Sequence, residues 1–110
     1  MNQWDIFLYP FLVERPHPVV VLSNDDRCRN PDLEDVNVLM CASIRSNRPL
    51  RNSEIVLNGA DGLDWSTAVR CDVIYLVPKA NFRELRGRVS ATRRAVIARK
   101  ICDCLRLPRP

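Results

Sequence analysis

Short apolar runs separated by turn-forming residues fill the first three quarters of the chain. The first run covers residues 5–11 (DIFLYPF). Pro10 confines it to the edge or the end of a strand, because proline cannot donate a ladder hydrogen bond. The second run, residues 19–23 (VVVLS), is rich in β-branched residues and has no polar break until Ser23. This pattern predicts a strand that is buried on both faces.

The same pattern predicts four further strands and their connections. Strands are expected at residues 36–44, 54–57, 67–77 and 84–89, with an Asn-Gly turn at 58–59. Residues 13–18 (VERPHP) are expected to form an extended loop, because two prolines flank His17. Residues 24–35 are expected to form a surface loop or one helical turn, and residues 45–53 and 62–66 to be connectors.

Residues 91–107 have a different pattern, with helix formers throughout. Ile97, Ile101, Cys104 and Leu105 recur at three- and four-residue spacing and form one apolar stripe. Ser90 is a candidate N-cap, and Pro108 ends the predicted helix. Several short strands followed by one amphipathic helix predict a mainly β (α+β) fold, a small, partly open β-barrel with a C-terminal α-helix.

Length and composition predict a single domain that spans residues 1–110. The hydrophobic fraction of 46% and the charged fraction of 27% are those of an ordinary globular protein, which argues against disorder. No apolar stretch approaches the ~20 residues of a membrane-spanning helix. Residues 1–9 lack a basic segment and contain Asp5, unlike a secretory signal. We therefore expect a cytoplasmic protein with no membrane association.

The net charge of +4 is distributed unevenly. From Lys79 onward there are ten basic and two acidic residues, whereas the first 78 residues contain seven basic and eleven acidic ones. A basic C-terminal third on a mildly acidic body suits a polyanion or an acidic protein partner. A solvated, arginine-rich helix without a partner has the same composition, so charge alone does not decide between these interpretations.

The five cysteines are expected to be reduced, buried thiols, because their number is odd and nothing in the sequence indicates export. Cys41 and Cys71 lie inside apolar runs, where a thiol packs as a small hydrophobic group. Cys102 and Cys104 are two residues apart on the predicted helix, so their side chains diverge by about 200°. With one histidine and no CxxC pair, the sequence predicts no metal site and no cofactor.

Three blocks of residues resemble the MazF/PemK family of toxins from type II toxin–antitoxin systems, and its Kid-like branch in particular. The first block is His17-Pro18 with the apolar run to Ser23. The second is Gly62-Leu63 and Ser66 leading into residues 69–72 (VRCD), and the third is Lys79, Leu85, Gly87 and Val89 before the basic helix. Because the order and spacing of the blocks also match, the likeness covers nearly the whole chain.

The resemblance implies an SH3-like barrel that forms a homodimer and binds a small acidic antitoxin. It also implies an mRNA interferase, an endoribonuclease that cleaves single-stranded RNA without a metal by activating the 2′-hydroxyl. Two alternatives stay open: a toxin that acts by protein binding, as CcdB poisons DNA gyrase, and an inactive module that binds nucleic acid or antitoxin. The C-terminal residues 105–110 (LRLPRP) lack the aromatic side chain on which CcdB-like action depends, which counts against the first alternative.

Cleavage through the 2′-oxygen needs a base, an acid for the leaving 5′-oxygen and a cation for the phosphorane charge. Arg70 and Asp72 are two residues apart on the predicted strand, so they would share one face, and they resemble the catalytic pair of the Kid-like branch. Asp72 would accept the 2′-proton, and Arg70 would stabilise the charge. A surface ion pair on a sheet has the same spacing, so the assignment depends on the flanking match.

Two family positions are altered in this chain. His17 replaces the family's motif arginine, with Arg15 two residues earlier, and the imidazole can act as acid or base or have no chemical role. At the family's phosphate-contacting threonine the alignment places Arg45, followed by Ser46. Both side chains can bind phosphate. A shift of one residue would place Ser43 there instead.

Arg15, Arg48 and Trp65 complete the predicted RNA-binding set, which also contains Arg45 and Ser46. The arginines are assigned to phosphates, because phosphate contacts supply much of the affinity for a nucleic acid. The indole of Trp65 is assigned to stacking on an unpaired base, provided that it is exposed. Phe82 is a second candidate for stacking, whereas at least Trp4 and Tyr75 are expected to be buried in the core.

Overall fold

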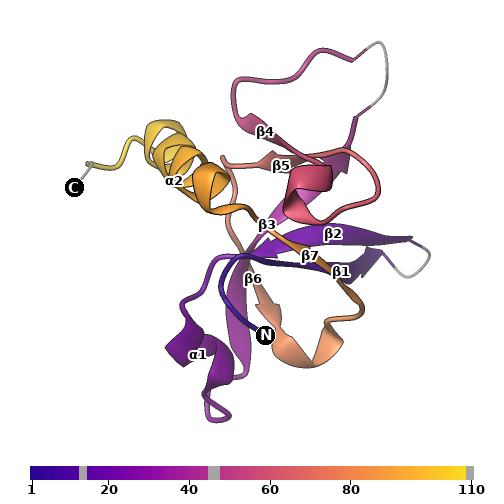
Figure 1. Ribbon diagram of the computed structural model, residues 1–110. Coiled ribbons are helices and arrows are strands. Elements are labelled where there is room, and N and C mark those ends of the chain that lie inside the picture. Colours follow the sequence, from indigo (N-terminus) through magenta and orange to yellow (C-terminus); the bar gives the residue numbers. More distant parts are fainter. Residues whose placement is uncertain (13–14, 45–47, 109–110) are drawn as a thin grey trace.

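A computed structural model describes residues 1–12, 15–44 and 48–108 (Figure 1). The strands are β1 (Asp5–Leu12), β2 (Arg15–Val21), β3 (Asp35–Ser43), β4 (Glu54–Leu57), β5 (Thr67–Arg70), β6 (Tyr75–Pro78) and β7 (Leu85–Arg88). The helices are α1 (Asp25–Arg29) and α2 (Ala91–Leu105), with short 3-10 turns η1 (Gly59–Asp61) and η2 (Lys79–Asn81). Each of the six predicted strands and the predicted C-terminal helix has a counterpart in the predicted order, but β2 begins earlier than predicted and the strand predicted at residues 67–77 is divided into β5 and β6.

The seven strands form one antiparallel, strongly curled sheet. Its strand order is β4-β5-β3-β2-β1-β7, and β6 also pairs with β3. β3 is the central strand, because it pairs with β2 on one side and with both β5 and β6 on the other. The expected mainly β, partly open barrel with a C-terminal helix is therefore confirmed.

Two apolar clusters stabilise the sheet. The first includes Leu39, Leu57, Val69 and Ile97, and it is covered by α2, which lies beside β4 and β5 in Figure 1. The second consists mainly of valines from β2, β3 and β6, together with Tyr9 and the half-buried rings of Phe7, Phe11, Tyr75 and Phe82. Val19, Val20 and Val21 are all fully buried, as the unbroken apolar run predicts.

The segment around His17 is a strand and not the predicted loop. β2 begins at Arg15, and its first residues pair only with β1, for example Leu8 with Pro18 and Tyr9 with His17. Pairing of β2 with β3 is confined to Val19–Val21. Pro16 and Pro18 therefore lie where one edge of the strand has no partner, and there a missing N–H disrupts no ladder.

The predicted strand at 67–77 is divided by a bend. β5 pairs with Cys41–Ser43, whereas β6 pairs with Asp35–Val38 farther back along β3. Residues 71–74 carry the chain between these two stretches, with Cys71 buried and residues 72–74 exposed. Arg70 and Asp72 are consequently not on one strand, and a spacing of two does not place them on the same face.

The start of α2 is fixed by Asp61 rather than by the hydroxyl of Ser90. Asp61 accepts hydrogen bonds from the backbone N–H groups of Ser90 (2.9 Å) and Asn58 (3.0 Å), and it pairs with Arg93 at 3.2 Å. Ser90 occupies the N-cap, but its side chain makes no capping bond. At Gly87 a Cβ would lie 2.4 Å from the carbonyl oxygen of Asp61, so only glycine permits this approach of β7 to η1. α2 ends two residues before the predicted end, with Arg106 in the left-handed conformation.

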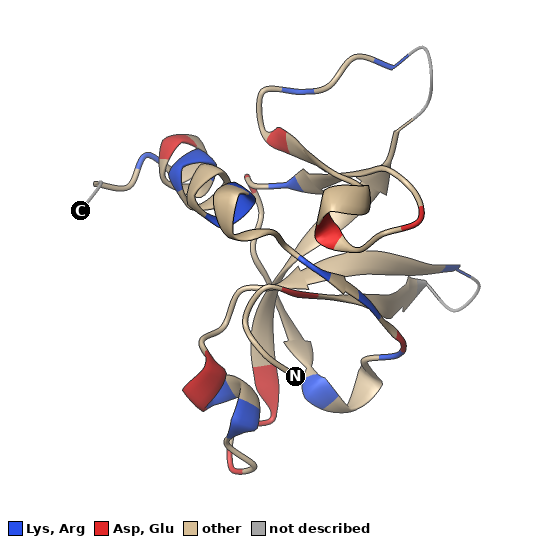
Figure 2. Ribbon diagram, in the orientation of Figure 1, with Lys and Arg blue, Asp and Glu red and all other residues tan. Residues whose placement is uncertain are grey.

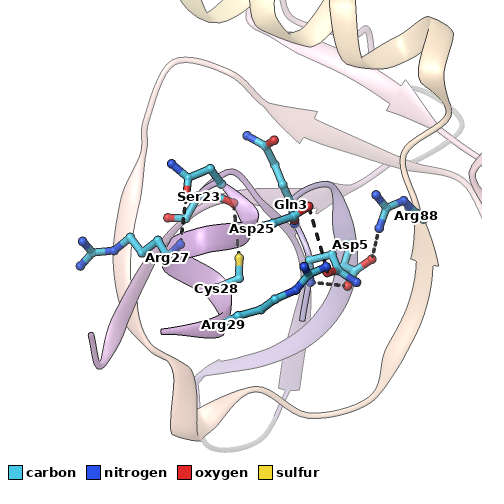
Figure 3. Close-up of polar contacts among 10 residues, drawn as sticks. Gln3, Asp5, Ser23, Asp25, Arg27, Cys28, Arg29 and Arg88 are labelled. Atoms are coloured by element: carbon cyan, nitrogen blue, oxygen red, sulfur yellow. Dashed lines mark hydrogen bonds and ion pairs between the residues drawn. The ribbon is translucent and has the colours of Figure 1, made fainter. Parts of the chain in front are cut away.

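Helix α1 holds the N-terminal segment against the sheet (Figure 3). Asp25 accepts a hydrogen bond from the backbone N–H of Gln3 at 2.8 Å, and Arg29 donates to the Asn2 side chain. Asp5 at the start of β1 is buried and binds Arg88 of β7 at 3.0 Å. These contacts account for a polar cluster that lies outside both apolar clusters.

The basic C-terminal third is partly neutralised within the fold. Arg86, Arg88 and Arg93 pair with Asp64, Asp5 and Asp61 respectively, and further basic residues lie along α2 (Figure 2). Across residues 1–12, 15–44 and 48–108, no helix combines the length and the apolar character that crossing a membrane requires.

Candidate functional site

A hollow of about 400 Å³ opens where β2, β3 and β5 meet the aromatic side chains of the second apolar cluster. It is lined by Phe11, His17, Met40, Cys41, Ala42, Ser43, Arg70 and Tyr75. Two of the three predicted catalytic residues, His17 and Arg70, therefore share this first hollow. Its walls are mainly apolar, with a few polar groups, which is the usual character of a ligand site.

A second hollow of about 240 Å³ adjoins the first, because His17, Cys41 and Ser43 line both. Its remaining walls are Pro18, Ile44, Trp65, Ser66 and Thr67. We call the two hollows together the groove. Trp65, which the sequence assigns to a base, shares the second hollow with His17, and no residue of α2 is among the described residues that line the groove.

Arg70 is the last residue of β5, and its partner in the ladder is Glu54 of β4. Its side chain is half-buried, and its Nε is buried without a hydrogen-bond partner among the described residues. A buried donor without an acceptor costs free energy, about 1–3 kcal/mol. The guanidinium that carries this Nε belongs to a residue that lines the first hollow, where an anionic ligand would pair with its charge.

Ser43 lies at the end of β3 with an exposed side chain, and it lines both hollows. It is the residue that the one-residue shift of the family alignment places at the phosphate-contacting position. Arg45 and Ser46, which the unshifted alignment places there, lie outside the described residues. Among the described residues, Ser43 therefore supplies a hydroxyl to the groove, two residues before Arg45 in the sequence.

Asp72 lies in a different place from His17 and Arg70. It is exposed in the bend after β5 and lines a third hollow, of about 360 Å³, with Asn52, Ser53, Lys100, Asp103 and Cys104. Neither lining of the groove includes it. The structure therefore separates Asp72 from the hollow that holds Arg70.

Arg48 is engaged with protein groups. Its guanidinium binds both carboxylate oxygens of Glu54, at 2.8 and 3.1 Å, and the carbonyl oxygen of Ser43 at 3.2 Å. The hydrogen bonds from Arg48 hold the pKa of Glu54 below its usual value. Glu54, which the sequence analysis did not single out, thus ties the connector to β4 beside the groove. Arg15 is exposed at the start of β2 and lines neither hollow.

The cysteines are all free, but only three are buried. Burial raises the pKa of the Cys41 thiol well above its usual range and that of Cys71 to about 12, so neither forms a thiolate near neutral pH. Cys102 and Cys104 are half-buried on α2, in contrast to the expectation of buried thiols. Across the described ranges no cluster of three His, Cys, Asp or Glu side chains is arranged to hold a metal ion.

The sequence matches a known family over nearly its whole length. Residues 2–105 match the family described as PemK-like, MazF-like toxin of type II toxin-antitoxin system. No curated protein matches the sequence. The match spans far more than half of the chain, so the chain belongs to this toxin family.

Several solved structures have the same fold. An endoribonuclease in complex with its cognate antitoxin, from a mycobacterial species, has a TM-score of 0.81 at 20% identity, over 100% of this chain and 99% of that one. The Mycobacterium tuberculosis toxin MazF-mt6 has a TM-score of 0.76 at 20% identity, over 96% and 99%. A MazE-MazF structure from Deinococcus radiodurans has a TM-score of 0.74 at 18% identity, over 98% and 97%. At these identities the likeness establishes the fold.

Proposed function

We propose that this member of the PemK-like, MazF-like toxin family is an endoribonuclease that cuts single-stranded RNA in the groove. The observation that carries the proposal is Arg70, a half-buried guanidinium with an unpartnered Nε, in the same hollow as His17 and Ser43. A half-buried cation beside a proton-transfer group and a hydroxyl matches the needs of phosphodiester cleavage. The neighbouring structure described as an endoribonuclease supports the same activity.

In the proposed reaction, the ribose 2′-oxygen attacks the adjacent phosphorus, and the bond to the 5′-oxygen of the next nucleotide breaks. The products are a 2′,3′-cyclic phosphate and a free 5′-hydroxyl. His17 accepts the 2′-proton, and the imidazolium so formed returns a proton to the leaving 5′-oxygen. Arg70 stabilises the negative charge of the phosphorane, and Ser43 donates a hydrogen bond to a phosphate oxygen. No metal is required.

Asp72 is the rival proton acceptor, because the family resemblance assigns that role to it. Two substitutions separate the two assignments. With His17 as the base, His17→Ala lowers the cleavage rate by about 10²–10⁴-fold, and Asp72→Asn lowers it much less. The reverse result would transfer the proton to Asp72 and would require its carboxylate to reach the phosphate from the third hollow.

The activity itself is tested by incubating the protein with a mixed single-stranded RNA in EDTA. We expect discrete fragments with cyclic phosphate ends and 5′-hydroxyl ends. Fragments that disappear in EDTA would contradict metal-independent cleavage. An absence of cutting by folded protein would instead favour a toxin that acts by protein binding, or an inactive binding module.

We further propose that the chain forms a homodimer and binds a small acidic antitoxin. Tyr75 of the first hollow has exposed apolar neighbours in the sequence. They are 40–60% exposed: Val73, Ile74 and Leu76. Adjacent exposed apolar residues are typical of an interface. Light scattering checks the dimer, and Leu76→Lys should shift the mass toward a monomer. A wild-type mass of one chain would contradict the homodimer. The complex of the mycobacterial endoribonuclease with its antitoxin supports the second partner.

A further inference from the structure

Trp65 is held in place by a neighbouring arginine that does not itself line the groove. The guanidinium carbon of Arg86 lies 4.7 Å from the centroid of the Trp65 ring. At that distance a cation is attracted to the face of an aromatic ring. Arg86 is absent from the lining of the second hollow, whereas Trp65 forms part of its wall.

Arg86 is itself fixed by two carboxylates. It lies 3.1 Å from Asp64, the residue before Trp65, and 3.7 Å from Glu84 at the start of the β7 region. Both carboxylates are mostly exposed, so each pair alone contributes little to stability. In the structure both pairs are formed while the guanidinium lies over the ring of Trp65, so they favour that position. A stacking surface whose orientation is fixed in advance loses less entropy when a ligand binds.

The second hollow lies beside the proposed cleavage centre, because His17 and Ser43 line both hollows. Its polar walls include the exposed hydroxyls of Ser43 and Ser66, whereas the hydroxyl of Thr67 already donates to the Ala42 carbonyl. A planar group that entered this hollow would meet the indole of Trp65 and hydroxyls that donate or accept hydrogen bonds.

We propose that the second hollow is the subsite for one unpaired nucleobase next to the cleaved phosphate, with Trp65 as its stacking wall and Arg86 as a positioning residue. This inference rests on the proposed function, since it takes the ligand to be single-stranded RNA. Arg86 acts on the base only through Trp65. It adds no phosphate contact of its own.

The test measures binding and not cleavage. The probe is a short RNA with 2′-O-methyl riboses, which cannot be cut through the 2′-oxygen. Trp4→Phe leaves Trp65 as the sole tryptophan, so its fluorescence reports stacking directly. We expect the probe to quench this fluorescence, and Trp65→Ala to weaken binding by about 5- to 150-fold, as for other base–aromatic stacks.

Arg86→Gln is expected to weaken binding about 3- to 10-fold in the protein that contains Trp65, which is within the general range for two coupled residues. In the Trp65→Ala background the same substitution should not weaken binding. Arg86→Lys should restore part of the loss, because it keeps the cation. Arg99→Gln on α2 is the matched control, with the same change of charge away from the groove. An equal loss for Arg86→Gln in both backgrounds would overturn the positioning role, because it would indicate a direct contact with phosphate.

Replacing the bases of the probe one at a time by abasic sites locates the subsite. One position should lose affinity for the wild-type protein and not for Trp65→Ala, and the absence of any such position would overturn the subsite. The proposed function fails separately. If the RNA quenches Trp65 but is never cut, the subsite stands without the nuclease. If it is cut with no effect of Trp65, the nuclease stands without the subsite.

Discussion

Two regions of the molecule differ in how their buried polar groups are bonded. We call the start of α2 the helix side and the groove the groove side. At the start of α2, the buried carboxylate of Asp61 is satisfied by two backbone N–H groups and by Arg93. In the groove, the buried Nε of Arg70 has no acceptor among the described residues. A satisfied buried network holds a fold together, whereas an unsatisfied donor calls for a separate explanation. The proposed function supplies one for Arg70, because an RNA phosphate in the groove would lie beside its guanidinium.

The largest expected effect is on the helix side. Asp61→Ala should lower the free energy of unfolding by about 3–5 kcal/mol, because it removes the acceptor of two backbone N–H groups and the carboxylate that pairs with Arg93. Arg93 keeps its hydrogen bonds to the Val56 carbonyl and the Asn58 side chain. Urea denaturation measures the change. Asp64→Ala is the control: its carboxylate also pairs with an arginine but is 77% exposed, so it should cost less than about 1 kcal/mol. Equal costs for the two substitutions would remove the distinction on which the comparison depends.

On the groove side the expected loss is of activity. Arg70→Gln should lower kcat for RNA cleavage by about 10²–10³-fold, the range for removing one stabilising donor from a charged transition state. The free energy of unfolding should stay the same or rise, since the substitution removes a buried Nε that has no acceptor among the described residues. Single-turnover cleavage and urea denaturation measure the two effects. If Arg70→Gln unfolds the protein, Arg70 belongs with the structural residues of the helix side.

The fold could be predicted from the sequence because its signals are local. The valine run of β2, the short run of β4 and the stripe of α2 each need only a few neighbouring residues to be recognised. The bend at residues 71–74 has no such signal. It arises because β5 and β6 pair with different parts of β3, and that choice of partners depends on the whole sheet.

The candidate site was less predictable for the same reason. The periodicity of a strand placed Arg70 and Asp72 together, and one bend separates them. Glu54 has no local signal at all, since its role depends on Arg48 folding back along the connector. Trp65 could be suggested from its residue type. Its partner Arg86 is distant in sequence and emerges only from the packing of β7 beside the second hollow.

The smallest expected effect concerns the pair of Arg48 and Glu54, which joins β4 to the end of β3 through the Ser43 carbonyl. The pKa of Glu54 is lowered in the folded protein, chiefly by the hydrogen bonds from Arg48, so the unfolded chain binds a proton more readily. The stabilisation is therefore complete above the unfolded pKa of about 4.3 and is lost as the pH falls through the lower folded value. We expect it to be modest, because the Arg48 side chain is 27% exposed.

Urea denaturation at a series of pH values from 6 to about 3 tests this pair. The stability of the wild type should fall more steeply in the acid range than that of Glu54→Gln, whereas the exposed Glu34→Gln should follow the wild type. Arg48 also binds the carbonyl oxygen of Ser43, so Glu54→Gln should lower cleavage at neutral pH slightly, by loosening one wall of the groove. An unchanged pH profile would mean that Glu54 is not held by Arg48 in solution. The shape of the groove would then be maintained by its strands, without a contribution from the Arg48–Glu54 pair.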